Sequence, residues 1–290
     1  LTGLTIALII AISINFLTCL YKGIGDTKFF YERPIRNTFK LLRWIFYEWN
    51  CKEISITTPD GTRLISMPNN YSSFIVYFRN FRDPNIQAFL KNNLVKGATF
   101  VDAGANIGTY TVRASQLVKG TGKVIAIEAH PFTYNYLLRN TKLNNLKNII
   151  PINIALGAEH GTIDMSFNQA NAGETHVATK GEESITVPMR TLDEILKGLD
   201  ISKVDYLKID VEGFEFPLLV GAKNTIKSNQ NIIIQTELDE NHPNRYGHPL
   251  SEINNLLFEL GLTPHTVDST GKPAVADKTN LKKGDVLWWR

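Results

Sequence analysis

The chain has 290 residues, a formal net charge of +3, and a composition of 43% hydrophobic and 20% charged residues. This length can bury one large core or two smaller ones. The nearly balanced charge, with no long basic run, argues against a nucleic-acid-binding surface. Two cysteines, Cys19 and Cys51, are too few for a disulfide framework or a metal cluster and agree with a reducing compartment.

The first 21 residues carry no charge, and their number is sufficient for a membrane-spanning helix. We predict a membrane anchor, with the body of the protein on the cytoplasmic side because basic residues follow the apolar run. Polar residues within the run leave a buried helix as an alternative, in which case the protein is cytoplasmic. A signal peptide is disfavoured because no small-residue cleavage site follows the apolar core. The basic residues are Lys22, Lys28, Arg33, Arg36, Lys40 and Arg43.

Residues 22–96 are predicted to form an N-terminal extension rich in aromatic residues. The segment 37–49, NTFKLLRWIFYEW, is typical of a helix. Pro59-Asp60-Gly61 separates two short β-prone runs and predicts a hairpin of residues 53–58 and 63–66. Asp83-Pro84 then predicts the start of another helix, which ends by Lys96-Gly97.

From residue 99 onward, strand-like and helix-like segments alternate, so we assign 97–290 to a single α/β domain. Such alternation predicts a mostly parallel sheet with helices on both faces. The stretch 157–190 breaks this rhythm and predicts an inserted hairpin with a polar loop beside the site. The predicted strands are 99–102, 123–128, 149–153, 205–210, 231–237, 263–267 and 285–290. The predicted helices are 107–118, 131–143, 191–198, 214–227 and 250–260.

Residues 99–112, TFVDAGANIGTYTV, read as a strand ending in Asp102, a loop with Gly104 and Gly108, and a helix. Such a turn lets the backbone approach a nucleotide closely. Glu128 follows Gly104 by 24 residues, at the end of the next strand, where an acid can hold both ribose hydroxyls. This spacing also suits NAD, so it leaves the cofactor open. Asn106 in the loop and Asn153 at the end of strand 149–153 complete the candidate cofactor-binding set.

A second cluster of charged residues lies in 204–216, VDYLKIDVEGFEF. Lys208 and Asp210 share one face of a predicted central strand, where charges are unusual. Glu212 lies in the following turn, and Glu237 ends the next strand at the same edge of the sheet. We predict these four residues as catalytic. The alternatives are an internal Lys208–Asp210 ion pair with solvated acids, or a divalent cation held by the three acids.

The chain resembles the FkbM-type methyltransferases, within the class I S-adenosylmethionine-dependent fold. The resemblance extends over roughly residues 75–265 and departs from the family at Ala129, where a proline is frequent. The matching segments are VDAGANIG at 101–108, IEAHP at 127–131, LRNTKLNN at 138–145, ALG at 155–157, RTLDEI at 190–195 and LKIDVEGFE at 207–215.

The resemblance implies a seven-stranded sheet with an antiparallel last strand, and S-adenosylmethionine as cofactor. It implies that Asp102, Gly104 and Gly108 line the methionine part and that Glu128 holds the ribose. The implied reaction is methyl transfer to a hydroxyl of a sugar, lipid or secondary metabolite. We predict no resident metal. We hypothesise that Asp210 is the general base, oriented by Lys208.

The histidines at 176, 242 and 248 are candidates to shape the acceptor pocket. Two rival functions are also compatible with the sequence. A nicotinamide-dependent oxidoreductase would use the same loop and acid, although GANIG lacks the third glycine of that pattern. A non-catalytic membrane-bound scaffold would be expected to have broken cofactor motifs.

Overall fold

The computed structural model describes residues 34–81, 83–166, 176–239, 246–278 and 281–290. The chain divides into two compact units, Leu1–Glu53 and Ile54–Arg290. The predicted extension is therefore divided, because its hairpin and the segment up to residue 96 belong to the second unit. The predicted anchor at 1–21 lies outside the described residues and stays a prediction. Within the described ranges, no helix has the length and apolar character needed to cross a membrane.

In the first unit, helix α3 (Pro34–Trp49) confirms the helix predicted within 37–49. Proline at the first position costs no hydrogen bond, because a helix leaves its first N–H groups without intrahelical partners. The helix ends where the Asn50 side chain donates to the Phe46 carbonyl at 2.6 Å and Cys51 adopts a φ of 49°.

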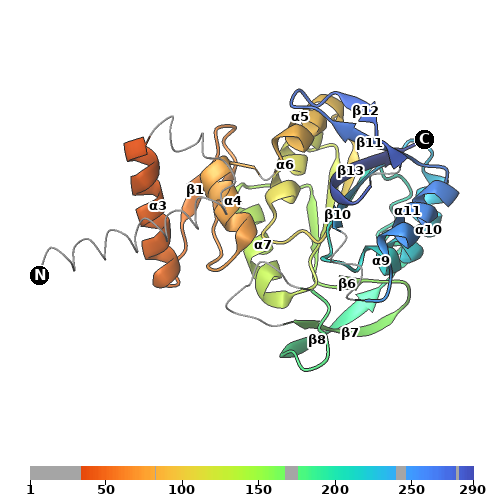
Figure 1. Cartoon of the computed structure of the whole chain (residues 1–290), viewed down its shortest axis with the longest axis horizontal. Helices are drawn as coiled ribbons and strands as arrows, with labels where there is room; N and C mark the ends of the chain where they lie inside the picture. Colours follow the sequence, from red (N-terminus) through yellow and green to blue (C-terminus); the bar gives the residue numbers. More distant parts are fainter. Residues whose placement is uncertain (1–33, 82, 167–175, 240–245, 279–280) are drawn as a thin grey trace, which may run out of the picture. The chain divides into compact units, whose positions relative to one another are not determined.

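The second unit contains a predominantly parallel sheet, which in the described residues has eight strands (Figure 1). Strand β13 is antiparallel to both of its neighbours, β10 and β11, and β12 is antiparallel to β11. The antiparallel last strand is thus confirmed, and β12 is one strand more than expected. In spatial order the strands are β12 (Pro273–Val275), β11 (Thr263–Val267), β13 (Lys283–Trp289), β10 (Ile233–Asp239), β9 (Tyr206–Ile209), β3 (Thr99–Ala103), β4 (Lys123–Ile127) and β5 (Ile149–Ile152).

Two apolar cores cover the two faces of this sheet. One contains Phe100 and Tyr206, whose rings stack at 5.0 Å between centroids, and packs against α5 (Pro84–Asn93) and α6 (Thr109–Val118). The other contains the alternate strand residues, such as Val101 and Leu207. Its covering helices are α8 (Leu192–Gly198), α9 (Glu215–Gly221), α10 (Lys223–Ser228) and α11 (Leu250–Glu259). Burial on both faces explains why the central strands are nearly continuous apolar runs.

The predicted insertion forms a separate small sheet, with strands β6 (Ala155–Leu156), β7 (Gly161–Ser166) and β8 (Ser184–Arg190). Strands β7 and β8 pair antiparallel over six residues each, which confirms the hairpin. Figure 1 shows β7 and β8 at one end of the second unit, away from the middle of the larger sheet. Residues 167–175 of the predicted polar loop lie outside the described residues.

The hairpin of β1 (Ser55–Thr57) and β2 (Arg63–Ile65) is confirmed and is held by α7 (Pro131–Leu143). The Asn140 side chain accepts from the Ile65 N–H at 2.6 Å and donates to the Ile107 carbonyl at 2.8 Å. Asn144 likewise exchanges two hydrogen bonds with the backbone of Arg63. The asparagines of segment 138–145 therefore join the hairpin, α7 and the glycine loop.

Three features differ from the sequence predictions. The helix predicted at 214–227 is divided at Ala222 into α9 and α10. Helix α4 (Tyr71–Arg79) was not predicted, because its run of apolar residues lacks a clear helical period, and its start depends on Asn70 accepting from the Ser73 N–H at 2.8 Å. The short strand β12 is exposed at all three residues and has no alternating pattern.

We predict that Asn140→Ala lowers the melting temperature of the full chain by about 5–15 °C. The change leaves buried backbone groups of Ile65 and Ile107 without partners, at a cost of about 2–4 kcal/mol in total. Asn135→Ala, at an exposed position of the same helix, is the matched control and should change little. Equal melting temperatures for the two variants, measured by calorimetry, would contradict this role of Asn140.

Candidate active site

The glycine loop joins the end of β3 to α6, and both glycines have positive φ, 79° for Gly104 and 92° for Gly108. A Cβ at Gly104 would lie 1.8 Å from the carbonyl oxygen of Asp210, the residue that follows β9. A Cβ at Gly108 would lie 2.8 Å from a methyl carbon of Leu137 on α7. Gly104 is therefore required by a backbone contact in addition to its conformation, whereas at Gly108 the positive φ is the main requirement, because the Leu137 methyl can shift.

Glu128 follows β4, and its carboxylate is held by two backbone donors. The N–H of Asn106 donates to Oε2 at 2.8 Å, and the N–H of His130 donates to Oε1 at 2.9 Å. The residue is only 4% exposed. Burial raises the pKa of Glu128 to about 7, although both backbone hydrogen bonds act in the opposite direction. The glycine loop and the β4–α7 connection are thereby linked through one carboxyl group.

Two asparagines support this carboxyl group. The Asn153 side chain donates to the carbonyls of Glu128 and Ala129, both at 2.8 Å, so it positions the β4–α7 connection. Asn106 has a φ of 51°, and its side-chain oxygen accepts from Asn70 at 3.0 Å. Since Asn70 also caps α4, this contact places the start of α4 next to the glycine loop.

A buried lysine joins two acids at the ends of β3 and β9. Lys208 Nζ lies 3.0 Å from Asp210 Oδ2 and 3.7 Å from Asp102 Oδ1, and the lysine side chain is 4% exposed. The same ammonium lies 4.8 Å from the ring centroid of Tyr110. Burial raises the pKa of Asp102, while Lys208 and the Thr111 hydroxyl, which donates to it at 2.6 Å, act to lower it. The charge on this strand is thus compensated locally, as burial of a cation requires.

The turn after β9 holds Glu212 in a left-handed conformation with a φ of 52°. The next residue, Gly213, has a φ of 101° and donates its N–H to Glu215 Oε1 at 3.0 Å. Burial raises the pKa of Glu215 to about 7. Positive φ is unfavourable for a glutamate. The hydrogen bond between Gly213 and Glu215 therefore stabilises the turn that carries Glu212.

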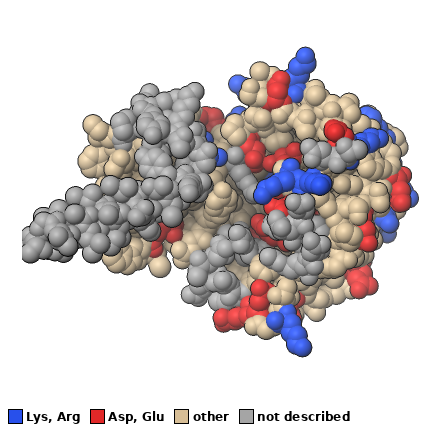
Figure 2. Space-filling model, viewed as in Figure 1, with Lys and Arg blue, Asp and Glu red and all other residues tan. Residues whose placement is uncertain are grey.

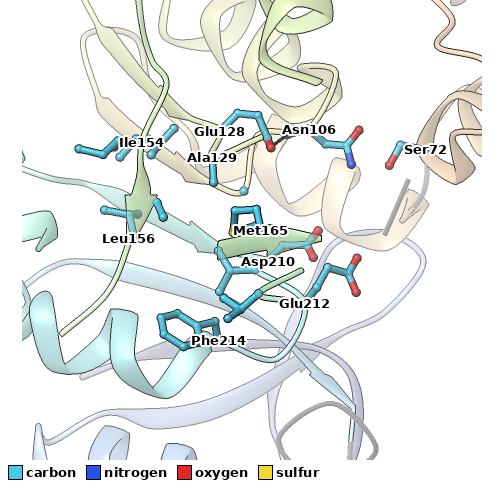
Figure 3. A pocket seen from close by; sticks show the side chains of 15 residues that line it. Ser72, Asn106, Glu128, Ala129, Ile154, Leu156, Met165, Asp210, Glu212 and Phe214 are labelled. Atoms are coloured by element: carbon cyan, nitrogen blue, oxygen red, sulfur yellow. Dashed lines mark hydrogen bonds between the residues drawn. The ribbon is translucent and has the colours of Figure 1, made fainter. Parts of the chain in front are cut away.

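One pocket collects residues from the ends of β3, β4 and β9 and from the small sheet (Figure 3). Figure 3 shows Ile154, Leu156 and Ala129 on one side and Asp210 and Glu212 on another, so the pocket has an apolar and a polar part. An adjoining pocket shares Gly104, Asn106, Ser72 and Asp210 and includes Lys208 and Tyr110. The first pocket is lined by Ser72, Gly104, Asn106, Ile127, Glu128, Ala129, Ile154, Ala155, Leu156, Met165, Val177, Asp210, Val211, Glu212 and Phe214.

The structure brings six of the ten predicted site residues to these two pockets: Gly104, Asn106, Glu128, Lys208, Asp210 and Glu212. The other four, Asp102, Gly108, Asn153 and Glu237, do not line either pocket. Asp102 is fully buried beneath the loop, and Glu237 pairs in register with Asp285 on β13. Among the residues that the structure describes, no group of three or more acids, histidines or cysteines is placed to hold a metal ion.

Some pocket residues were not predicted from the sequence. Met165 and Val177 come from the small sheet, where they form an isolated β-bridge, and Phe214 comes from the turn before α9. Their apolar side chains carry no chemical signature in the sequence.

The candidate histidines do not line either pocket within the described residues. His176 Nε2 lies 3.1 Å from Glu182 Oε2. The His248 ring stacks on Phe216 at 4.6 Å, and its Nδ1 lies 3.0 Å from Glu252. The histidine at 242 lies outside the described residues.

Figure 2 shows acidic side chains gathered near the middle of one face, on either side of a basic side chain.

The sequence profile of the FkbM methyltransferase domain matches residues 102–262. A hexuronic acid methyltransferase of Haloferax volcanii is 30% identical over 135 residues, which are 46% of this chain and 54% of that protein. A methyltransferase of Sordaria araneosa is 25% identical over 177 residues, 50% of this chain and 68% of that protein. An FkbM methyltransferase structure from Methylobacillus flagellatus has a TM-score of 0.46 at 18% identity, covering 76% of this chain and 53% of that chain. The match to the Haloferax protein spans about half of that protein's length.

The raised pKa of Glu128 predicts a pH-dependent stability. The folded protein binds a proton at Glu128 up to about pH 7, whereas the unfolded chain releases it near the ordinary value of 4.5. The unfolding free energy of the wild type, relative to Glu128→Gln, should therefore fall by ~3 kcal/mol as the pH rises from below 4.5 to above 7. Denaturant unfolding across this range measures it, and a pH-independent difference between the two proteins would exclude a buried titrating Glu128.

Proposed function

This chain belongs to the FkbM methyltransferase family, and we propose that it transfers the methyl group of S-adenosylmethionine to a hydroxyl group. The observation that carries the proposal is the convergence of Glu128, the Gly104 loop and Asp210 on one pocket at the carboxyl ends of β3, β4 and β9. Ligands of open α/β sheets bind at this edge. The match to the family extends over more than half of the chain.

The pocket residues fit a nucleoside cofactor. The two oxygens of Glu128 already accept one backbone N–H each, which fixes the carboxylate and leaves lone pairs for a pair of ribose hydroxyls. The apolar side, with Ile154, Leu156 and Met165, suits a purine base. The polar side, with Asn106 and the adjoining pocket, suits the amino-acid end of the cofactor. We assign Asp102, Gly108 and Asn153 supporting roles beneath these contacts.

The bound cofactor would supply a methyl group made reactive by a sulfonium. The protein's contribution is then to orient the acceptor oxygen and to remove its proton, and orientation can supply much of the rate enhancement. We assign proton removal to Asp210, which lines both pockets and whose side chain is 18% exposed. The ion pair with Lys208 holds this carboxylate in one orientation. Glu212 lies at the rim of the same pocket, where it can bind the acceptor.

The acceptor class follows from the relatives and from the pocket. The Haloferax relative is described as a hexuronic acid methyltransferase, and we propose that this chain likewise acts on a hydroxyl of a sugar, or of a glycan, lipid or secondary metabolite. Glu212 and Asp210 provide acceptors for the hydroxyl donors of such a molecule. We do not assign Glu237 a contact with the acceptor, because it lines neither pocket.

We predict that S-adenosylhomocysteine stabilises the purified chain against heat and that NADH does not. At a pH above 7, where Glu128 is ionised, Glu128→Gln should weaken the binding of S-adenosylhomocysteine by about tenfold to a hundredfold, because a hydrogen bond to a charged group contributes about 1.5–3 kcal/mol. Titration calorimetry measures the loss. Glu259→Ala, at an exposed position of α11, is the matched control and should bind like the wild type. Stabilisation by NADH alone would favour an oxidoreductase instead.

We predict that Asp210→Asn binds S-adenosylhomocysteine with nearly unchanged affinity but turns over about 10²–10⁴-fold more slowly. The side chain keeps its size and its place beside Lys208 but loses the ability to take a proton. Glu212→Gln should have a smaller effect, since it binds the acceptor without removing the proton. The acceptor is first identified by mass spectrometry of methylated products from a glycan and metabolite extract.

Two results would contradict this assignment. An Asp210→Asn variant with wild-type turnover would remove Asp210 from the proton transfer and direct attention to Glu212. Intact cofactor binding without methylation of any acceptor in the extract would favour the non-catalytic scaffold.

A further inference from the structure

Helix α3 exposes a continuous apolar face, which we call the α3 face and define as Ile35, Phe39, Leu42, Phe46 and Trp49. The spacing of four and three residues puts all five on one side of the helix over about four turns. Their exposed fractions are 75%, 69%, 52%, 56% and 87%, respectively. Single exposed apolar residues are ordinary, but five in one row on a 16-residue helix mark an interaction surface.

Basic side chains accompany the α3 face along one side. Arg36 and Arg43 are exposed and lie one position after Ile35 and Leu42, and Lys40 lies one position after Phe39. The Arg43 guanidinium lies 5.5 Å from the ring centroid of Tyr47, the aromatic residue next to Phe46. In the helical repeat, Arg43 and Arg36 are about 80° and 100° from the centre of the face and border it, whereas Lys40 is about 140° away and half-buried. Glu48, the acidic residue of the helix, lies about 140° from the centre on the other flank, as far from it as Lys40.

We infer that the α3 face lies on an anionic lipid surface, with the helix parallel to the membrane plane. An apolar face with large aromatic side chains and a bordering row of cations is the pattern of interfacial helices, in which the apolar side enters the acyl boundary and the cations contact the headgroups. Trp49 and Tyr47 are side chains that favour this depth. The length of α3 is below that of a membrane span, so the helix binds the surface without crossing it.

The charges favour a lipid surface over a second copy of the chain. The apolar spacing would also suit a coiled coil, but α3 covers little more than two heptads, and coiled coils need about three or four. In a parallel pair, the positions beside the seam would be Arg36 and Arg43 on one side and Thr38 and Ile45 on the other. No oppositely charged pair would form across such a seam, whereas headgroup phosphates would neutralise both arginines.

The test uses the full chain with Cys19→Ser and Cys51→Ser, and an environment-sensitive fluorophore on a single introduced cysteine. Phe39→Cys and Phe46→Cys place the label on the α3 face, and Val275→Cys is the matched control, a 66%-exposed apolar residue in the second unit. The probes are vesicles of phosphatidylcholine alone or mixed with phosphatidylglycerol, with or without a spin-labelled lipid as quencher. We expect the labels at 39 and 46 to shift to shorter wavelength and be quenched in the anionic vesicles, and the label at 275 to stay in water.

The charge requirement is tested by adding Arg36→Gln and Arg43→Gln to the labelled Phe39→Cys chain. The ratio of lipid-buried to water-exposed label should fall about 30-fold, since each cation contributes about 1 kcal/mol at an anionic surface. Labels at 39 and 46 that stay in water in anionic vesicles would overturn the inference, even if another segment holds the chain on the vesicle. Labels already shielded without lipid would also overturn it, and cross-linking between the labelled positions would then identify a second copy as the occupant.

Discussion

The close approach of two strand ends is the constraint on which the site depends. The Asp210 carbonyl oxygen lies so near the Cα of Gly104 that any side chain at position 104 would collide with it. This contact joins the loop after β3 to the end of β9, neighbouring strands of the sheet. Because the loop is held there, Asn106 reaches Glu128 after β4, and three strand ends share one pocket. The glycine therefore contributes to the architecture of the site before any cofactor is considered.

Several charged side chains are buried near the pocket. Lys208 is placed between Asp102 and Asp210, and its ammonium also faces the ring of Tyr110. Tyr110 in turn donates to Asp83 at 3.0 Å, so the compensation extends away from the pocket. Glu128 and Glu215, in contrast, have pKa values raised by burial to about 7. A carboxylate that is buried without a cation beside it is costly, and strongly shifted pKa values of this kind are frequent at functional sites.

The pocket and the exposed apolar helix α3 lie in different units of the chain. The second unit holds the sheet, the pocket and the residues matched by the FkbM family. The hairpin of β1 and β2 belongs to it, because Asn140 and Asn144 of α7 bind the hairpin backbone. The first unit holds α3, whose exposed apolar row has no counterpart in the methyltransferase motifs. The proposed cofactor binding and the proposed contact with lipid therefore involve different residues and can be tested separately by mutation.

The sequence by itself determined the alternation of strands and helices from residue 99 onward and, among ten predicted site residues, the six that reach the pockets, because glycines and charges at strand ends are strong local signals. The antiparallel last strand was implied by the resemblance to the FkbM-type methyltransferases. It did not determine that Glu237 lies outside the pocket, because register between β10 and β13 is a property of the assembled sheet. It could not predict that Met165 and Val177 line the pocket, because apolar side chains look alike until a second sheet brings them there. Likewise, the sequence could not show why position 104 must be glycine. The Asp210 carbonyl excludes a side chain there, and this contact exists only because β9 pairs with β3 in the tertiary structure.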